Sequence, residues 1–176
     1  MEIEVKRLNE LIVTLFNNIK NISDEGREYP IMWNIMHMFS SSQLAKLLAL
    51  RRGINVELSS IAALLHDIAV IITKKSEGHA EKAEEYVLDV INKHNNEVLD
   101  DSLRISKEEE LILVRAIVNH SDKTSYSDEP FVELLKDIDL VDRFLHGIKT
   151  EGIYLDRCRR VFKELCIDEQ NIFFES

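Results

Sequence analysis

The sequence predicts one all-α domain of about seven helices. Apolar residues recur three and four positions apart along nearly every segment, which is the spacing of an amphipathic helix. No segment alternates apolar and polar residues between hairpin turn signals, as strands would. The 176 residues suffice for a single core and are few for two. We therefore expect an N-terminal covering helix in residues 1–25, a core in 29–147, and a C-terminal helix and tail in 152–176.

Three helices are expected in the N-terminal half of the chain. The first follows apolar residues from Ile3 to Ile19 and should cover the core from outside. The second begins at Pro30, a residue suited to the first helical position, and stops at Gly53. The third, over 56–72, is apolar on almost every side, so it should be the central and most buried helix.

Four more helices are expected in the C-terminal half. Ser106 and Glu109 form a capping-box pattern that starts one of them, and Pro130 starts the next. Polar loops separate these helices, and the loop 121–129, which is rich in Ser and Asp, is expected to be flexible. His94 and His146 are expected at exposed helix ends. The expected ranges are 79–94, 106–120, 130–147 and 152–166.

Composition indicates which classes of binding partner and which cellular compartment to expect. A net charge of −10 disfavours nucleic acid, which a basic surface would bind. The N-terminus lacks the apolar region of a signal peptide, and we expect no membrane-spanning segment. The two cysteines are expected to be reduced thiols. The sequence thus predicts a soluble cytoplasmic protein with no nucleic-acid or membrane partner.

The dipeptide His66-Asp67 is the strongest chemical signal, because it interrupts the apolar run 61–70. An imidazole and a carboxylate buried without partners would cost several kcal/mol. Both groups bind divalent ions such as Zn, Fe, Ni, Co and Mn, so a bound metal would compensate this cost. Two further candidate ligands, His37 and Asp139, lie in apolar helical patterns elsewhere in the chain. Taken alone, each histidine could equally be a core residue satisfied by hydrogen bonds.

The order of these residues resembles the HD-domain superfamily of metal-dependent phosphohydrolases. The likeness extends from about Tyr29 to about Gly147. It implies that one divalent metal ion is held by four residues, and that the aspartate ligand is the second of the Asp-x-Asp unit rather than Asp137. These four residues are His37, His66, Asp67 and Asp139.

The resemblance also concerns a second ion. Members with two additional histidines at comparable places carry a second metal beside the first, bridged by the aspartate of the dipeptide. In this chain those histidines are His79 and His120, and the bridging residue would be Asp67. Contact with the substrate phosphate and ordinary helix capping by the two histidines are the alternatives, and the sequence leaves them open.

For the activity, the resemblance implies hydrolysis of a phosphate ester or anhydride, with a nucleotide as the preferred small phosphorylated substrate. Asp67 would take part in catalysis with metal-activated water. Lys123 is the preferred cation for the phosphate because it shares a loop with His120, while Lys74 and Lys75 are weaker candidates. The chain lacks an acidic residue directly after the dipeptide and lacks a Gly-Tyr-Pro signature. Nucleoside 5′-monophosphatase and cyclic-di-GMP phosphodiesterase activities are therefore disfavoured.

Two other functions fit the same residues. A di-iron oxygenase could use this helical scaffold and ligand set. A non-catalytic regulator could bind a nucleotide or a metal there without turnover. The sequence leaves open the substrate, the native metal and whether the protein forms a homodimer.

Overall fold

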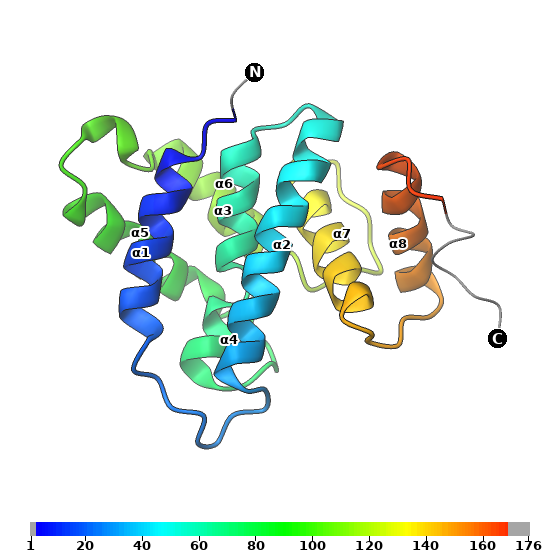
Figure 1. The fold of residues 1–176 in the computed structure, drawn as a ribbon, viewed down its shortest axis with the longest axis horizontal. Helices are drawn as coiled ribbons and strands as arrows, with labels where there is room; N and C mark the ends of the chain where they lie inside the picture. Colours follow the sequence, from blue (N-terminus) through cyan, green and yellow to red (C-terminus); the bar gives the residue numbers. More distant parts are fainter. Residues whose placement is uncertain (1–2, 169–176) are drawn as a thin grey trace.

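Eight α-helices and one short 3₁₀ helix form the fold in the computed structural model, which describes residues 3–168 (Figure 1). No strand occurs in this range, so the all-α class is confirmed. In chain order the helices are α1 (Lys6–Ile19), α2 (Ile31–Arg52), α3 (Val56–Leu65), α4 (Ile68–Thr73), α5 (Ala83–Glu97), η1 (Asp101–Leu103), α6 (Lys107–Val118), α7 (Pro130–Leu145) and α8 (Ile153–Glu164).

Helix α3 lies at the centre, packed against α1, α2, α6 and α7. Its residues Ile61, Ala63 and Leu65 are fully buried, as expected of a helix that is apolar on nearly all sides. The covering helix α1 also contributes to this core through its apolar stripe, which includes Leu8 and Leu11.

The expected single helix over 56–72 is wrong, because the chain leaves helical geometry at the dipeptide. Asp67 has φ −102° and ψ 16°, so α3 ends at Leu65 and α4 begins at Ile68. On one continuous helix, the side chains of neighbouring residues would diverge by about 100°. The break removes this constraint, and His66 and Asp67 face the same cluster.

One described segment is long and apolar enough to cross a membrane, although the sequence led us to expect none. Val56–Thr73 has a mean hydropathy of 1.7, but 83% of it is buried inside the protein. This burial is typical of core helices in soluble proteins, so the segment by itself is weak evidence for membrane insertion.

The boundaries of the other helices determine where the remaining histidines lie. The capping box of Ser106 and Glu109 is present at the start of α6. Helix α5 starts at Ala83, later than expected, because residues 77–82 form turns, and His79 lies in these turns. His94, which looked like an exposed helix end, is fully buried and donates its Nε2–H to the Leu103 carbonyl.

Helix α8 contributes a fully buried arginine that no sequence pattern indicated. Arg157 donates to Asp137 on α7 at 2.8 Å, and to the backbone oxygens of Lys123 and Ser125 at 2.7 Å each. These contacts fasten the loop that carries Lys123 to the end of the bundle. The loop was expected to be flexible, yet hydrogen bonds from Arg157 hold it at the carbonyls of Lys123 and Ser125.

We predict that Arg157→Met lowers the free energy of unfolding by about 3 kcal/mol, since it removes one partner of the buried ion pair with Asp137 and the donor to the Lys123 carbonyl. This is the low end for a broken buried pair, because Asp137 also pairs with Arg52 and Arg160. Urea unfolding followed by circular dichroism would measure the change. The control, Arg159→Met, alters a half-exposed arginine of the same helix and should stay within about 0.5 kcal/mol. Equal stabilities for the two variants would contradict the buried role.

Candidate metal centre

All six residues proposed as metal ligands meet in one cluster. His37 comes from α2 and Asp139 from α7, and the dipeptide lies at the junction of α3 and α4. The other two histidines come from the turns before α5 and from the residues just after α6. Five of the six are at most 1% exposed, and the His79 side chain is 13% exposed. The cluster consists of His37, His66, Asp67, His79, His120 and Asp139.

One side of the cluster brings four possible donor atoms together. The Nε2 atoms of His37 and His66 are 3.1 Å apart, and His37 Nε2 is 3.1 Å from Asp139 Oδ1. Asp67 Oδ2 is 3.6 Å from both imidazole nitrogens. Ligands bonded at about 2.1 Å to one ion lie about 3.0 to 3.4 Å apart. The spacing of these atoms therefore fits a single divalent ion.

The other oxygen of Asp67 faces a second group. Asp67 Oδ1 is 3.0 Å from His79 Nε2 and 3.8 Å from His120 Nε2, and these two nitrogens are 3.0 Å apart. This oxygen is buried and accepts no hydrogen bond from the described part of the chain. A buried carboxylate oxygen without a partner is costly. The residues thus fit a second ion, with the Asp67 carboxylate between the two positions.

Backbone carbonyls fix the orientation of three imidazoles. The Nδ1 atoms of His66, His79 and His120 lie 2.6 to 2.7 Å from the carbonyl oxygen three residues earlier. A carbonyl can only accept, so each Nδ1 carries a hydrogen, and the neutral form of each ring presents the Nε2 lone pair to the cluster. Lone pairs facing one another at about 3 Å repel unless a cation lies between them. This donor arrangement fits metal binding better than it fits an ion-free core.

His37 is held differently, and the sequence did not indicate how. Its Nδ1 lies 2.5 Å from Asp142 Oδ2, and its ring stacks on Trp33 with 5.1 Å between centroids. The sequence favours a pairing of Asp142 with Arg143 or a nearby base; Asp142 pairs with the bases His37 and His146, whereas Arg143 binds Asp139 at 2.9 Å. Asp142 lies three positions after Asp139 on α7, and this helical spacing was the available signal.

Two cations border the cluster. Lys123 Nζ is 2.5 Å from Asp139 Oδ2, and Arg143 binds the other oxygen of the same carboxylate. Burial raises the pKa of Asp139, but Lys123 and Arg143 outweigh burial and hold the pKa well below its usual range. The candidate lysines 74 and 75 are not in the cluster. Lys74 binds the Glu25 carbonyl, and Lys75 pairs with an acidic side chain at 3.7 Å.

The charges of the cluster also act on the histidines. Burial lowers the pKa of His37, but hydrogen bonds to Asp139 and Asp142 reverse this effect and raise the pKa to about 9. Burial, together with the charges of Lys123 and His66, lowers the pKa of His120 well below its usual value. The cluster therefore combines ionised carboxylates with at least one neutral imidazole, which are the ligand forms that divalent metals require.

A cavity of about 400 Å³ opens beside the cluster. His79, Asp139, Lys123 and Arg143 line it on the polar side. Its other walls are aromatic and apolar or belong to the segment after α7: Tyr29, Leu140, Ile148, Lys149, Thr150 and Tyr154, with Ser76 and Ser121 completing the lining. This cavity is the candidate substrate site.

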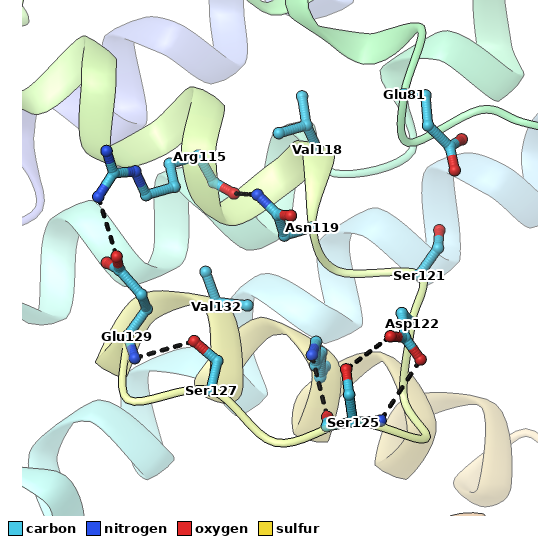
Figure 2. A pocket seen from close by; sticks show the side chains of 11 residues that line it. Glu81, Arg115, Val118, Asn119, Ser121, Asp122, Ser125, Ser127, Glu129 and Val132 are labelled. Carbon is cyan, nitrogen blue, oxygen red and sulfur yellow. Dashed lines mark hydrogen bonds and ion pairs between the residues drawn. The ribbon is translucent and has the colours of Figure 1, made fainter.

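A larger cavity of about 460 Å³ lies nearby and is shown in Figure 2. It shares Ser121 with the first cavity but contains none of the six cluster residues. Asp122 lies at its edge and accepts from Ser125, so this carboxylate serves to shape the loop. We therefore assign the chemistry to the smaller cavity.

Comparisons with known proteins agree with this geometry. The family model described as HD domain matches residues 34–146, which is more than half of the chain, so the protein belongs to the HD-domain family. The fold is similar to the crystal structure of a predicted HD superfamily hydrolase from an uncultured Thermotogales bacterium. That match has a TM-score of 0.56 and 21% sequence identity, and covers 96% of this chain and 79% of the other. No curated protein matches the chain.

We predict that His66→Ala and Asp67→Ala each abolish binding of the first ion, because each removes a central donor. Elemental analysis of purified protein measures this directly. The control is His146→Ala, which changes a ring at the end of α7 outside the cluster and should keep the metal content. Stripping the ion from the unaltered protein should also lower its melting temperature, since the ligands join separate helices. Metal content that survives both substitutions would contradict the site.

A separate prediction concerns the second ion. His79→Ala should lower the metal stoichiometry by one, because His79 faces the Oδ1 oxygen of Asp67, at 3.0 Å, and not the Oδ2 oxygen on the side of the first ion. The protein should stay folded with its first ion, because His79 lies in a turn. His120→Ala should have the same effect on stoichiometry, with a larger loss of stability because this ring is fully buried. Two ions retained in both variants would contradict the second ion site. Weaker substrate affinity would then assign these histidines to phosphate contact, and unchanged affinity and turnover would assign them to capping.

Proposed function

We propose that the protein is a metal-dependent phosphohydrolase that acts on a small phosphate ester or anhydride, with a nucleotide as the preferred substrate. The observation that carries this proposal is the position of Asp67, whose two oxygens face two groups of imidazoles next to a cavity bordered by cations. The protein's membership of the HD-domain family supports the proposal. The description of the similar solved protein as a predicted hydrolase supports it too.

The cluster residues would hold one divalent transition metal ion and a second beside it. Fe, Mn, Ni, Co and Zn all accept this mixture of imidazole and carboxylate ligands. Bound there, such ions would lower the pKa of water and draw charge from the phosphoryl oxygens. Asp67 would orient both groups of ligands from the middle of the cluster.

Two side chains of this chain are placed to neutralise a phosphate. Lys123 is 11% exposed and Arg143 is 28% exposed, so both face the cavity from positions mostly shielded from water. Charge contacts in such positions stabilise developing negative charge more strongly than in bulk water. They matter because the net charge of −10 would otherwise repel an anionic substrate.

The apolar part of the cavity would receive the organic part of the substrate. Tyr29 and Tyr154 offer aromatic faces, and Leu140 and Ile148 offer aliphatic contacts. Its volume of about 400 Å³ lies in the range of small-molecule sites. These features support a compact phosphorylated metabolite rather than a nucleic acid, in keeping with a cytoplasmic enzyme.

A screen of metal-loaded protein against phosphate compounds tests this proposal. Nucleoside mono-, di- and triphosphates, dinucleotides and sugar phosphates would each be incubated with Mn²⁺, Co²⁺ or Ni²⁺, and released phosphate measured. Turnover that disappears in His66→Ala supports the hydrolase. Iron in the purified protein with oxygen consumption would instead support the oxygenase. Tight nucleotide binding without turnover would support the regulator.

For Lys123, we predict that Lys123→Ala lowers kcat on the active substrate by about tenfold to a hundredfold, the low end for one preorganised charge contact. The fold and the first ion should be kept, because the four proposed ligands are unchanged. Steady-state kinetics at low and moderate salt measure the effect. The matched control is Lys93→Ala, a half-exposed lysine of α5 outside the cavity that pairs with Asp89 and should alter kcat little. Unchanged kcat/KM in Lys123→Ala would remove this lysine from the site.

A further inference from the structure

His37 differs from the other three imidazoles of the cluster in the group that holds its Nδ1. The other three donate to backbone carbonyls of their own local turns. His37 donates to the carboxylate of Asp142, which lies 105 positions further along the chain, with 2.5 Å between Nδ1 and Oδ2. Hydrogen bonds to an ionised acceptor are shorter and stronger than those to a neutral carbonyl.

The position of His37 within its helix explains this difference. It lies inside the long helix α2, and the acceptor for its ring is a side chain of the neighbouring helix α7. His66 and His120 lie at or just after helix ends, and His79 lies in a turn, and a carbonyl of the same segment accepts from each of these rings. The hydrogen bond of His37 therefore joins two helices, whereas the other three are local.

Asp142 acts on this imidazole with little competition. It is 1% exposed, and among residues 3–168 its carboxylate pairs only with the rings of His37 and His146, the latter at 3.3 Å. Asp139, by contrast, is shared with Lys123 and Arg143. The negative charge of Asp142 thus acts mainly on His37, and a carboxylate in this position makes an imidazole a stronger metal ligand.

We propose that Asp142 is a positioning residue that makes the ion site of His37, His66 and Asp139 the tighter of the two, so that this site fills first. The site of His79 and His120 has only neutral carbonyls behind its imidazoles and fills second. This inference depends on the metal centre of the proposed function but not on the reaction catalysed there.

Stepwise titration of chelator-treated protein with Co²⁺ tests the proposal, with visible absorption and calorimetry as readouts. The unaltered protein should give two unequal dissociation constants. Asp142→Asn keeps the shape and an acceptor oxygen but loses the charge, and should weaken the tighter site about tenfold to a hundredfold. The weaker site should be unchanged. Asp142→Glu, which keeps the charge, should retain more of the tight affinity than Asp142→Asn.

Asp89→Asn is the matched control, because it makes the same substitution on the exposed face of α5. Both of its constants should equal those of the unaltered protein. The loss of Co²⁺ affinity in Asp142→Asn must also depend on His37. In a His37→Ala background, adding Asp142→Asn should change neither constant further.

Three results would overturn the inference: unchanged constants in Asp142→Asn, the same loss in the His37→Ala background, or equal losses in the Asn and Glu variants. The second and third would show that Asp142 acts through the fold and not through the imidazole. Two ions bound by unaltered protein with no effect of Asp142→Asn would refute this inference alone. Unaltered protein that binds no ion would refute the proposed function as well.

Discussion

The site depends on the buried carboxylate of Asp67 and on the groups that surround it. This carboxylate is buried at the break between α3 and α4, and each of its oxygens faces a different group of imidazoles. A buried charge of this kind is stable only with compensating charge or hydrogen bonds around it. The arrangement of α2, α6, α7 and the turns before α5 directs histidines and a second carboxylate, that of Asp139, toward the same point. Lys123 and Arg143 pair with Asp139, and bound divalent cations would compensate the charge of Asp67.

The helix break and the metal centre are linked. A continuous helix over 56–72 would pack equally well as an apolar rod, but it would separate the directions of His66 and Asp67. Ending α3 at Leu65 also frees the Ala63 carbonyl, which then orients the His66 ring. A local departure from regular helix thus serves the site directly, and the surrounding apolar core holds it in place.

The fold class and the dipeptide His66-Asp67 were predictable from local patterns, whereas the full set of ligands followed from the order of residues that resembles the HD-domain family. The 3.6-residue spacing indicated the helices, and polar residues inside apolar runs indicated His66 and Asp67. The break at Asp67 was not predictable, because the residues on both sides of the His66-Asp67 dipeptide are apolar and compatible with a helix. The partner of Asp142 was also hidden, since it lies 105 positions away and only the packing of α2 on α7 reveals it.

The position of the loop after His120 was likewise not predictable from local sequence. Its Ser and Asp content indicated a flexible segment, whereas Arg157 of the distant helix α8 fixes two of its carbonyls. Lys123 is therefore held near Asp139 by a helix outside the metal cluster, and α8, whose Tyr154 lines the cavity, contributes no residue to the cluster itself. Contacts of this kind join segments far apart in sequence, and no local periodicity encodes them.

The most direct measurement is anomalous X-ray diffraction from crystals of the protein loaded with Mn²⁺ or Co²⁺. The proposed centre predicts two anomalous peaks, one beside each oxygen of Asp67, with the peak near His37 and Asp139 the more fully occupied. The absence of any peak within the His/Asp cluster, or ions bound only elsewhere on the protein, would contradict the central claim.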